Sequence, residues 1–150
     1  MKKLFLALLL LLTFAANAQD NFSLTDTTGK QHHLSDYKGK WLIVNYWATW
    51  CPPCLEEIPD FVHLYDAHKD KDLMIIGVAM EYKEPKEVTD FTSDMLISYP
   101  IAFGKAPQNV LIGKVEALPT TFIFNPQGEL VKTKRGLVTR KQIESLLKDK

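Results

Sequence analysis

Two nearly continuous apolar runs, residues 41–47 (WLIVNYW) and 73–80 (LMIIGVAM), most constrain the fold of this chain. Both are rich in β-branched and aromatic residues, as is typical of strands buried on both faces of a sheet. Between them, residues 55–70 carry apolar side chains at helical spacing, although Pro59 should kink that helix. The order strand, helix, strand predicts parallel pairing with a right-handed crossover.

The other segments predict a mixed sheet with helices on both faces and an N-terminal hairpin. Residues 21–24 and 31–34 flank a turn-rich stretch and form the predicted hairpin, followed by one helical turn with Ser35 as its N-cap. Strands at 120–125 and 129–134 are joined by the turn sequence NPQG and should be antiparallel. The remaining predicted elements are a helix at 85–96, a short strand at 99–103, a short helix at 108–112, and a final helix that opens with a T-x-x-Q capping box (Thr139, Gln142) and runs to Leu147.

The first eighteen residues, MKKLFLALLLLLTFAANA, have the pattern of a secretory signal. Two lysines precede an apolar run at 4–14, which is too short to span a bilayer because a spanning helix needs about 20 residues. The closing ANA matches the A-x-A cleavage pattern. We therefore expect a signal peptide at 1–18, one domain at 19–150 and a periplasmic location. An uncleaved N-terminus that anchors the chain to the inner membrane is the alternative.

Charge argues against a nucleic-acid partner. The formal net charge is +0 at pH 7, and no long basic or acidic run stands out. We expect a monomer that binds no nucleic acid.

Both cysteines of the chain lie within WATWCPPC, residues 47–54. Export would place them in an oxidising compartment, where disulfides persist. A bridge from Cys51 to Cys54 closes a very short loop and restricts the unfolded chain little, so it adds little stability. A C-x-x-C motif near a β-α-β pattern is instead typical of redox chemistry.

The two cysteines should divide the chemistry between them. Cys51 falls at the start of a helix, where free N–H groups and partial positive charge stabilise a thiolate. We therefore expect its pKa to fall toward neutrality and its sulfur to face solvent, whereas Cys54, one turn further on, should be more buried. Cys51 would attack a disulfide, and Cys54 would then attack Cys51 and release the product. Pro52 and Pro53 fit the first helical turn, where no intrahelical hydrogen bond is lost.

A zinc half-site and two incidental core thiols are the alternatives for the cysteine pair. Zinc needs about four ligands, and the chain has no second cysteine pair. His32 and His33 alternate across a predicted strand, and His63 and His68 lie on poorly matched helix faces. We expect no metal and no cofactor, and we interpret all four histidines as structural or surface residues.

Taken together, these motifs resemble the thioredoxin superfamily, in particular its exported TlpA/ResA-type reductases. The resemblance covers residues 22–147 and rests on NFSLTDTTGKQHHLSDYKGK, WLIVNYWATWCPPC, LEEIPDF and EALPTTFIFNPQGELV. It implies a thioredoxin-like α/β fold with a mixed central sheet. It also implies a protein-disulfide reductase that acts on thiol and disulfide groups of client proteins.

The resemblance also implies a cis peptide bond before Pro119, in a loop that lies beside the cysteines and pairs its backbone with the substrate. A proline that simply begins a strand is the alternative. The residues that the resemblance places at the substrate are Trp50, Pro52, Leu118, Pro119 and Thr120.

One position departs from thioredoxin itself, which has a buried aspartate on the strand before the active site. Asn45 stands there in this chain and cannot accept a proton from Cys54. Glu57 lies three residues after Cys54, on the same helical face, and the exported reductases carry a glutamate there. We expect Glu57 to be partly buried, to have a raised pKa and to exchange protons with Cys54. A solvated helix glutamate is the alternative.

Pro53 precedes the second cysteine, where strong oxidants of the superfamily usually carry histidine. We therefore expect a potential toward the reducing end of the range from about −270 to −120 mV. The resemblance implies a membrane thiol transporter as electron donor, and clients in cytochrome c or copper-site maturation. A copper-binding metallochaperone and a thiol peroxidase of related fold are the rival functions.

Overall fold

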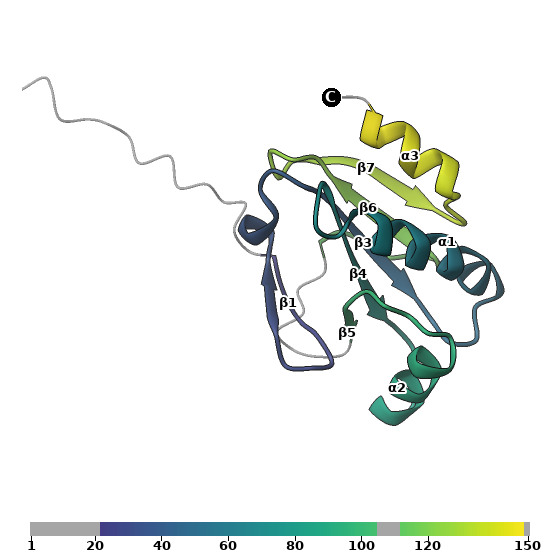
Figure 1. Ribbon diagram of the computed structural model, residues 1–150. Helices are drawn as coiled ribbons and strands as arrows, with labels where there is room; N and C mark the ends of the chain where they lie inside the picture. Colours follow the sequence, from purple (N-terminus) through teal and green to yellow (C-terminus); the bar gives the residue numbers. More distant parts are fainter. Residues whose placement is uncertain (1–21, 105–111, 149–150) are drawn as a thin grey trace, which may run out of the picture.

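The computed structural model describes residues 22–104 and 112–148. The helices and strands follow the predicted order (Figure 1). The elements are β1 (Ser23–Thr25), β2 (Gln31–His33), the 3₁₀ helix η1 (Leu34–Tyr37), β3 (Trp41–Trp47), α1 (Pro52–His68), β4 (Leu73–Ala79), α2 (Pro85–Asp94), β5 (Ile101–Phe103), β6 (Thr120–Phe124), β7 (Leu130–Arg135) and α3 (Arg140–Lys148).

Five strands form one mixed sheet in the order β5-β4-β3-β6-β7. β3, β4 and β5 pair in parallel, as β-α-β crossovers require, whereas β6 is antiparallel to both β3 and β7. Ile43 at the centre of β3 lies opposite Ile75 of β4 and Ile123 of β6. β1 and β2 form a separate antiparallel hairpin. The predicted mixed sheet and N-terminal hairpin are confirmed.

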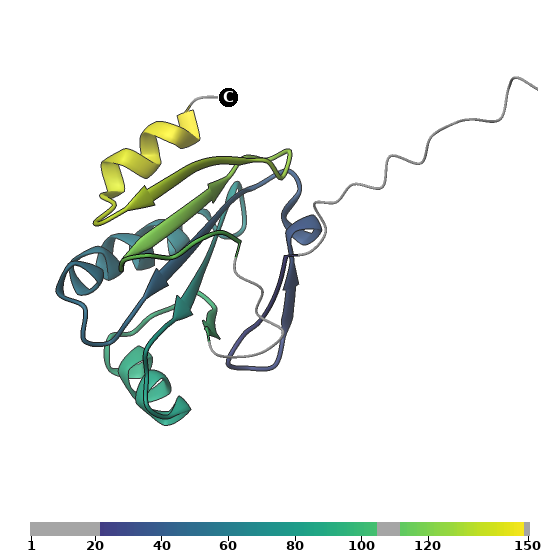
Figure 2. The same ribbon diagram turned by 180° about the vertical axis from the view of Figure 1, so that it is seen from behind.

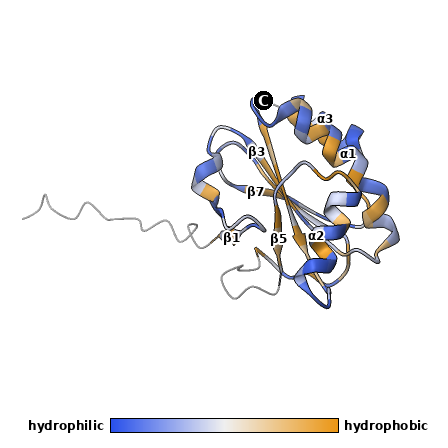
Figure 3. Ribbon diagram, turned by 60° about the horizontal axis from the view of Figure 1, so that its bottom comes forward, coloured by the Kyte–Doolittle hydropathy of each residue, from blue (hydrophilic) through white to orange (hydrophobic). Residues whose placement is uncertain are grey.

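The two faces of the sheet bury two apolar clusters. Because side chains alternate along a strand, Ile43 and Trp47 of β3 point to one face, where α1, α2 and α3 contribute to the cluster. Val44 and Tyr46 point to the other face, which the β1–β2 hairpin and η1 cover (Figure 2). Figure 3 shows the hydrophobic colouring concentrated in the strands at the centre of the molecule.

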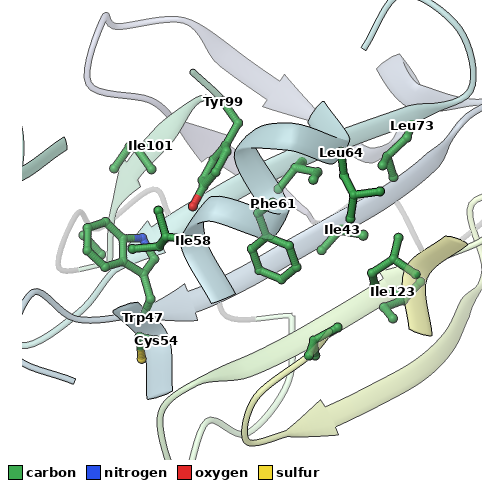
Figure 4. Close-up of a cluster of buried hydrophobic side chains, with 14 of the residues drawn as sticks. Ile43, Trp47, Cys54, Ile58, Phe61, Leu64, Leu73, Tyr99, Ile101 and Ile123 are labelled. Atoms are coloured by element: carbon green, nitrogen blue, oxygen red, sulfur yellow. The ribbon is translucent and has the colours of Figure 1, made fainter. Parts of the chain in front are cut away.

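α1 brings the two cysteines and Glu57 to the first of these faces. Its buried residues recur at helical spacing (Cys54, Glu57, Ile58, Phe61 and Leu64). Figure 4 shows Phe61 inside the cluster and Cys54 at its edge. The helix continues past Pro59, which lies on the exposed side of α1.

η1 begins two residues before the predicted helical turn. Ser35 was expected to be the N-cap, but the N-cap is His33, whose backbone N–H donates to Asp36 Oδ2 at 2.8 Å. Asp36 is the third residue of η1, and its carboxylate accepts from the N-cap N–H as the acidic residue of a capping box does. Gly39 has φ +90, a conformation that glycine adopts without strain, and the chain turns there into β3.

Two predicted features lie outside the described residues. They are the signal peptide at 1–18 and, apart from Ile112, the short helix at 108–112. Within 22–104 and 112–148, no helix combines the length and the apolar character that crossing a bilayer demands.

Candidate active site

Cys51 and Cys54 form a disulfide at the point where β3 leads into α1. Cys51 is the N-cap of α1, with extended backbone, and Pro52 and Pro53 occupy the first turn. The two Cα atoms are 5.3 Å apart. Pro52 and Pro53 carry no N–H, and the N–H of Leu55 donates to the carbonyl of Cys51 at 3.1 Å. The N–H of Cys54 and the aligned peptide dipoles of α1 therefore supply the partial positive charge beside the sulfur of Cys51. The placement predicted for both cysteines is confirmed.

The exposure predicted for Cys51 is wrong for the disulfide form. Cys51 is 3% exposed and Cys54 0%, so both cysteines are buried. Both cysteines belong to the core cluster, and the backbone N–H of Cys51 donates to the carbonyl of Ala48 at 3.2 Å. Cys54 is more buried than Cys51, as predicted, but their exposed fractions differ little.

The loop before the cysteines is held from two sides. Thr49 Oγ1 donates to Glu87 Oε1 at 2.7 Å, and the backbone N–H of Lys83 donates to Glu87 Oε2 at 3.1 Å. The backbone N–H of Met80 donates to the carbonyl of Trp47 at 2.8 Å. α2 and the end of β4 therefore fix the path of the chain into Cys51.

The peptide bond between Leu118 and Pro119 is cis, as the resemblance implied. Thr120 of β6 lies opposite Tyr46 of β3, so this loop stands at the end of the sheet where β3 leads into the cysteines. Thr120 Oγ1 donates to the carbonyl of Ala117 at 2.7 Å, which ties the loop to itself. Leu118 is half-buried, whereas Pro119 and Thr120 are buried.

The two tryptophans that flank the motif differ in exposure. Trp47 is 0% exposed, belongs to the core cluster and contacts Phe91 with ring centroids 5.5 Å apart. Trp50 is 57% exposed, and Pro52 next to Cys51 is exposed as well. Of these tryptophans, only Trp50 offers an aromatic surface to another molecule.

Glu57 is buried, as predicted, with 1% exposure. Its Oε1 accepts from Asn45 Nδ2 at 2.7 Å, and its Oε2 accepts from the backbone N–H of Val138 at 2.9 Å. Burial raises the pKa of Glu57 from 4.5 to about 7, although the hydrogen bonds from Val138 and Asn45 favour the ionised form and oppose the rise. A carboxyl group with such a pKa both accepts and releases a proton near neutral pH.

Two neighbours of Glu57 were not assigned a role from sequence. Asn45 was considered only as a residue unable to accept a proton, and Thr121 was not considered. Asn45 Nδ2 donates to Thr121 Oγ1 at 3.1 Å as well as to Glu57. The available signal was Asn45 itself, a polar amide within the apolar run at 41–47; its position opposite Thr121 is seen only in the sheet.

A second buried polar cluster lies in the N-terminal hairpin. His32 is 0% exposed; its Nε2 lies 2.9 Å from Asp26 Oδ2, and its Nδ1 hydrogen-bonds the hydroxyl of Tyr37. Asp26 also forms an antiparallel β-bridge to Ala102 of β5. The interpretation of His32 as structural agrees with this geometry. Across 22–104 and 112–148, no group of three or more His, Cys, Asp or Glu side chains is arranged to hold a metal.

A mixed sheet that presents a C-x-x-C disulfide at a helix N-terminus, beside a cis-proline loop, defines the thioredoxin-like thiol-disulfide oxidoreductases. Comparison with known proteins agrees. The model of the AhpC/TSA family matches residues 15–133. The thiol-disulfide oxidoreductase ResA of Bacillus subtilis is 37% identical over 128 residues, which are 85% of this chain and 70% of that protein. ResA of Geobacillus kaustophilus is 37% identical over 125 residues, 83% of this chain and 71% of that protein.

Solved structures show the same likeness. StoA from Bacillus subtilis aligns with a TM-score of 0.72 and 28% identity, covering 85% of this chain and 96% of that one. A thiol:disulfide interchange protein from Chlorobium tepidum aligns with a TM-score of 0.74 and 27% identity, covering 85% and 91%. The chain therefore belongs to the AhpC/TSA family, as a thioredoxin-like thiol-disulfide oxidoreductase. The resemblance seen in the sequence is confirmed.

Proposed function

We propose that this protein is a periplasmic reductase of disulfides in client proteins. The observation that carries the proposal is the Cys51–Cys54 disulfide at the start of α1, with the carboxyl group of Glu57 buried one turn further along the helix. This arrangement provides an attacking thiolate, a resolving thiol and a proton acceptor from one short segment.

The reaction starts from the reduced protein. The Cys51 thiolate attacks one sulfur of the client disulfide; a Cys51–client disulfide forms, and the other client sulfur leaves as a thiolate. Cys54 then loses its proton and attacks the Cys51 sulfur. The Cys51–Cys54 disulfide forms, and the second client thiolate is released. Two electrons pass from the cysteine pair to the client.

Glu57 serves the second step. Cys54 has no exposed surface, so its proton needs an acceptor inside the protein. Glu57 follows it by three residues on the buried face of α1 and titrates near neutral pH. The carboxylate takes the proton of Cys54 as the resolving thiolate forms.

The client binds over the exposed residues that surround the buried disulfide. Trp50 and Pro52 provide exposed surface beside Cys51, and the loop of Leu118, Pro119 and Thr120 stands at the same end of the sheet. An extended client segment would pair with the backbone of this loop while its cysteine approaches Cys51.

Export and electron supply complete the proposal. The signal pattern at 1–18 sends the domain at 19–150 to the periplasm, or anchors it to the inner membrane if it is not cleaved. A membrane thiol transporter re-reduces the pair, and the clients belong to cytochrome c or copper-site maturation. One chain supplies both cysteines and Glu57, so a monomer suffices.

Two assays test this function together. The reduced protein should speed the reduction of insulin by dithiothreitol, and its potential, equilibrated against glutathione, should lie toward the reducing end of the thioredoxin range, near about −270 mV. The double variant Cys51→Ser/Cys54→Ser is the control and should be inert. A potential near about −120 mV would reverse the assigned direction, and inactivity toward insulin would remove the reductase function.

Membership of the AhpC/TSA family makes a thiol peroxidase the second candidate. Peroxide consumption by the reduced protein at a rate above its insulin reduction would favour the peroxidase. Tight Cu(I) binding without any thiol exchange would favour the metallochaperone.

A further inference from the structure

The amide of Asn45 lies at a junction between β3, β6 and α1. Its Nδ2 donates to Glu57 Oε1 at 2.7 Å and to Thr121 Oγ1 at 3.1 Å. Asn45 and Thr121 are 0% exposed, and Glu57 is 1% exposed. The carbonyl oxygen of the same amide, Asn45 Oδ1, is buried and has no hydrogen-bond partner among the described residues.

This orientation of the amide suits the ionised form of Glu57 best. A carboxylate oxygen accepts hydrogen bonds, and both N–H groups of the amide are directed at acceptors. A protonated carboxyl group carries one O–H donor. Oε2 already accepts from the backbone N–H of Val138, and it stays the better acceptor if the added proton lies on Oε1, facing Asn45.

Two donors would then face each other across the 2.7 Å contact between Asn45 Nδ2 and Glu57 Oε1. Turning the amide end for end relieves the conflict, because Oδ1 then takes the place of Nδ2 and accepts from the Oε1–H group. Thr121 accommodates both orientations, since its hydroxyl either accepts from Nδ2 or donates to Oδ1. One amide atom is unpaired in each orientation, so the penalty for an unpaired buried group is present in both.

We propose that Asn45 is a positioning residue that holds the carboxyl group of Glu57 in place in both charge states, by reversing its amide while Thr121 serves as the second partner. The inference rests on the proposed role of Glu57 in accepting the proton of Cys54. It explains how that carboxyl group can gain and lose a proton inside the core without losing its hydrogen bonds.

The other groups that face Glu57 do not titrate in competition with it near neutral pH. Burial raises the pKa of Tyr99, and the charge of Glu57 raises it further, so the phenol stays protonated. Val138 contributes a backbone N–H, and the side chains of Asn45 and Thr121 are neutral. On α1 itself, Cys54 titrates only when the disulfide is reduced.

The experiment is a pH titration of the oxidised, mature protein by NMR. The ¹³C signal of the Glu57 carboxyl group and the side-chain ¹⁵N–¹H signals of Asn45 should move with the same midpoint, since the amide reverses as the carboxyl group ionises. Asn45 signals that stay constant while Glu57 titrates would overturn the proposal.

Variants give a second, independent readout. Asn45→Leu removes a hydrogen bond from both charge states of Glu57. The bond to the carboxylate is the stronger of the two because it is charge-assisted, so the Glu57 midpoint should move upward, by less than about one pH unit. Thr121→Val should move it in the same direction by less, and Thr121→Ser, which keeps the hydroxyl, should restore the wild-type value. An unchanged midpoint in both Asn45→Leu and Thr121→Val would also overturn the proposal. If Asn45→Leu does not fold, the Glu57 midpoints of Thr121→Val and Thr121→Ser are compared instead, and equal midpoints would overturn the proposal.

Insulin reduction by the same wild-type sample separates this inference from the proposed function. Coupled titration of Asn45 and Glu57 in a protein that reduces no insulin would overturn the reductase function and leave the amide reversal supported. Insulin reduction without the coupled titration would support the reductase function and overturn the amide reversal.

Discussion

The backbone N–H of Val138 donates to Glu57 Oε2 at 2.9 Å, although the two residues are 81 positions apart in the sequence. Val138 is 2% exposed and stands just before α3. Three residues after Glu57, Asp60 Oδ2 accepts from the backbone N–H of Arg140 at 2.9 Å. α1 therefore anchors the start of α3 through two carboxylates, and one of them is the proposed proton acceptor.

Ionisation of Glu57 should make the protein less stable as pH rises. Burial raises the pKa of Glu57 from 4.5 to about 7, so between these values the folded protein keeps a proton that the unfolded chain has lost. The contribution of Glu57 to the free energy of unfolding should be largest below pH 4.5, fall through this window by about 3 kcal/mol, and level off above about 7. Urea unfolding of the oxidised protein across this range measures the slope.

Glu57→Gln should lack this part of the slope, because glutamine does not titrate. Glu56→Gln is the matched control, since Glu56 is its exposed neighbour on α1. Equal slopes in wild type and Glu57→Gln would show that the carboxyl group ionises alike in the folded and unfolded chains.

Trp50 should matter for client reactions and not for folding. Trp50→Ala removes an aromatic side chain that is 57% exposed beside Cys51, and we expect kcat/KM for protein disulfides to fall about tenfold with little change in Tm. Leu130→Ala is the control, because Leu130 is 44% exposed but pairs with Phe124 at the opposite end of β6. Equal losses in the two variants would contradict a client surface around Trp50.

The buried cluster of Asp26, His32 and Tyr37 at the N-terminal hairpin should stabilise the protein most above pH 4. Burial alone raises the pKa of Asp26, but hydrogen bonds from Thr28 and His32 outweigh it, so the pKa lies below 3.8. The stabilisation is therefore present above 3.8 and is lost as pH falls through the lower folded value. Asp26→Asn should lower the free energy of unfolding at neutral pH by about 2 kcal/mol, measured by urea unfolding.

Asp90→Asn provides the comparison for Asp26→Asn. Asp90 pairs with Lys86 one turn away on the surface of α2, and both side chains are largely exposed. Such pairs contribute little, so the change should stay within about 0.5 kcal/mol. A loss as large as that of Asp26→Asn would mean that burial of the hairpin cluster is not the cause.

The architecture could be predicted from the sequence where a residue pattern is compatible with a single kind of secondary structure. The apolar runs at 41–47 and 73–80 are too long for turns and lack helical spacing, and they are β3 and β4 almost to the residue. The burial of Glu57 beside Cys54 was predicted because residues three apart lie on the same face of a helix.

What could not be predicted depends on contacts between distant segments. The donation from Val138 to Glu57 and the alignment of Asn45 with Thr121 arise only when strands and helices have packed. The burial of Cys51 has the same origin, because Cys51 belongs to a core cluster built from several strands and helices. A local pattern does not encode such distances.

The two thiols should react at different rates once the disulfide is reduced. Cys51 lies at the electropositive start of α1, whereas Cys54 is 0% exposed in the disulfide form. Iodoacetamide at mildly acidic pH should label Cys51 at least about tenfold faster than Cys54, as followed by peptide mass spectrometry. The difference should vanish in denaturant, and equal slow labelling in the native protein would contradict the assigned roles.

Trapping of the mixed disulfide tests the central claim most directly. Cys54→Ser should accumulate a covalent adduct between Cys51 and a disulfide substrate such as oxidised insulin, because the resolving sulfur is absent. Cys51→Ser should accumulate almost none, because the remaining thiol is buried. Intact-mass analysis of both variants after equal exposure gives the result. Adduct on Cys54 in Cys51→Ser, at a level equal to that on Cys51 in Cys54→Ser, would contradict the account.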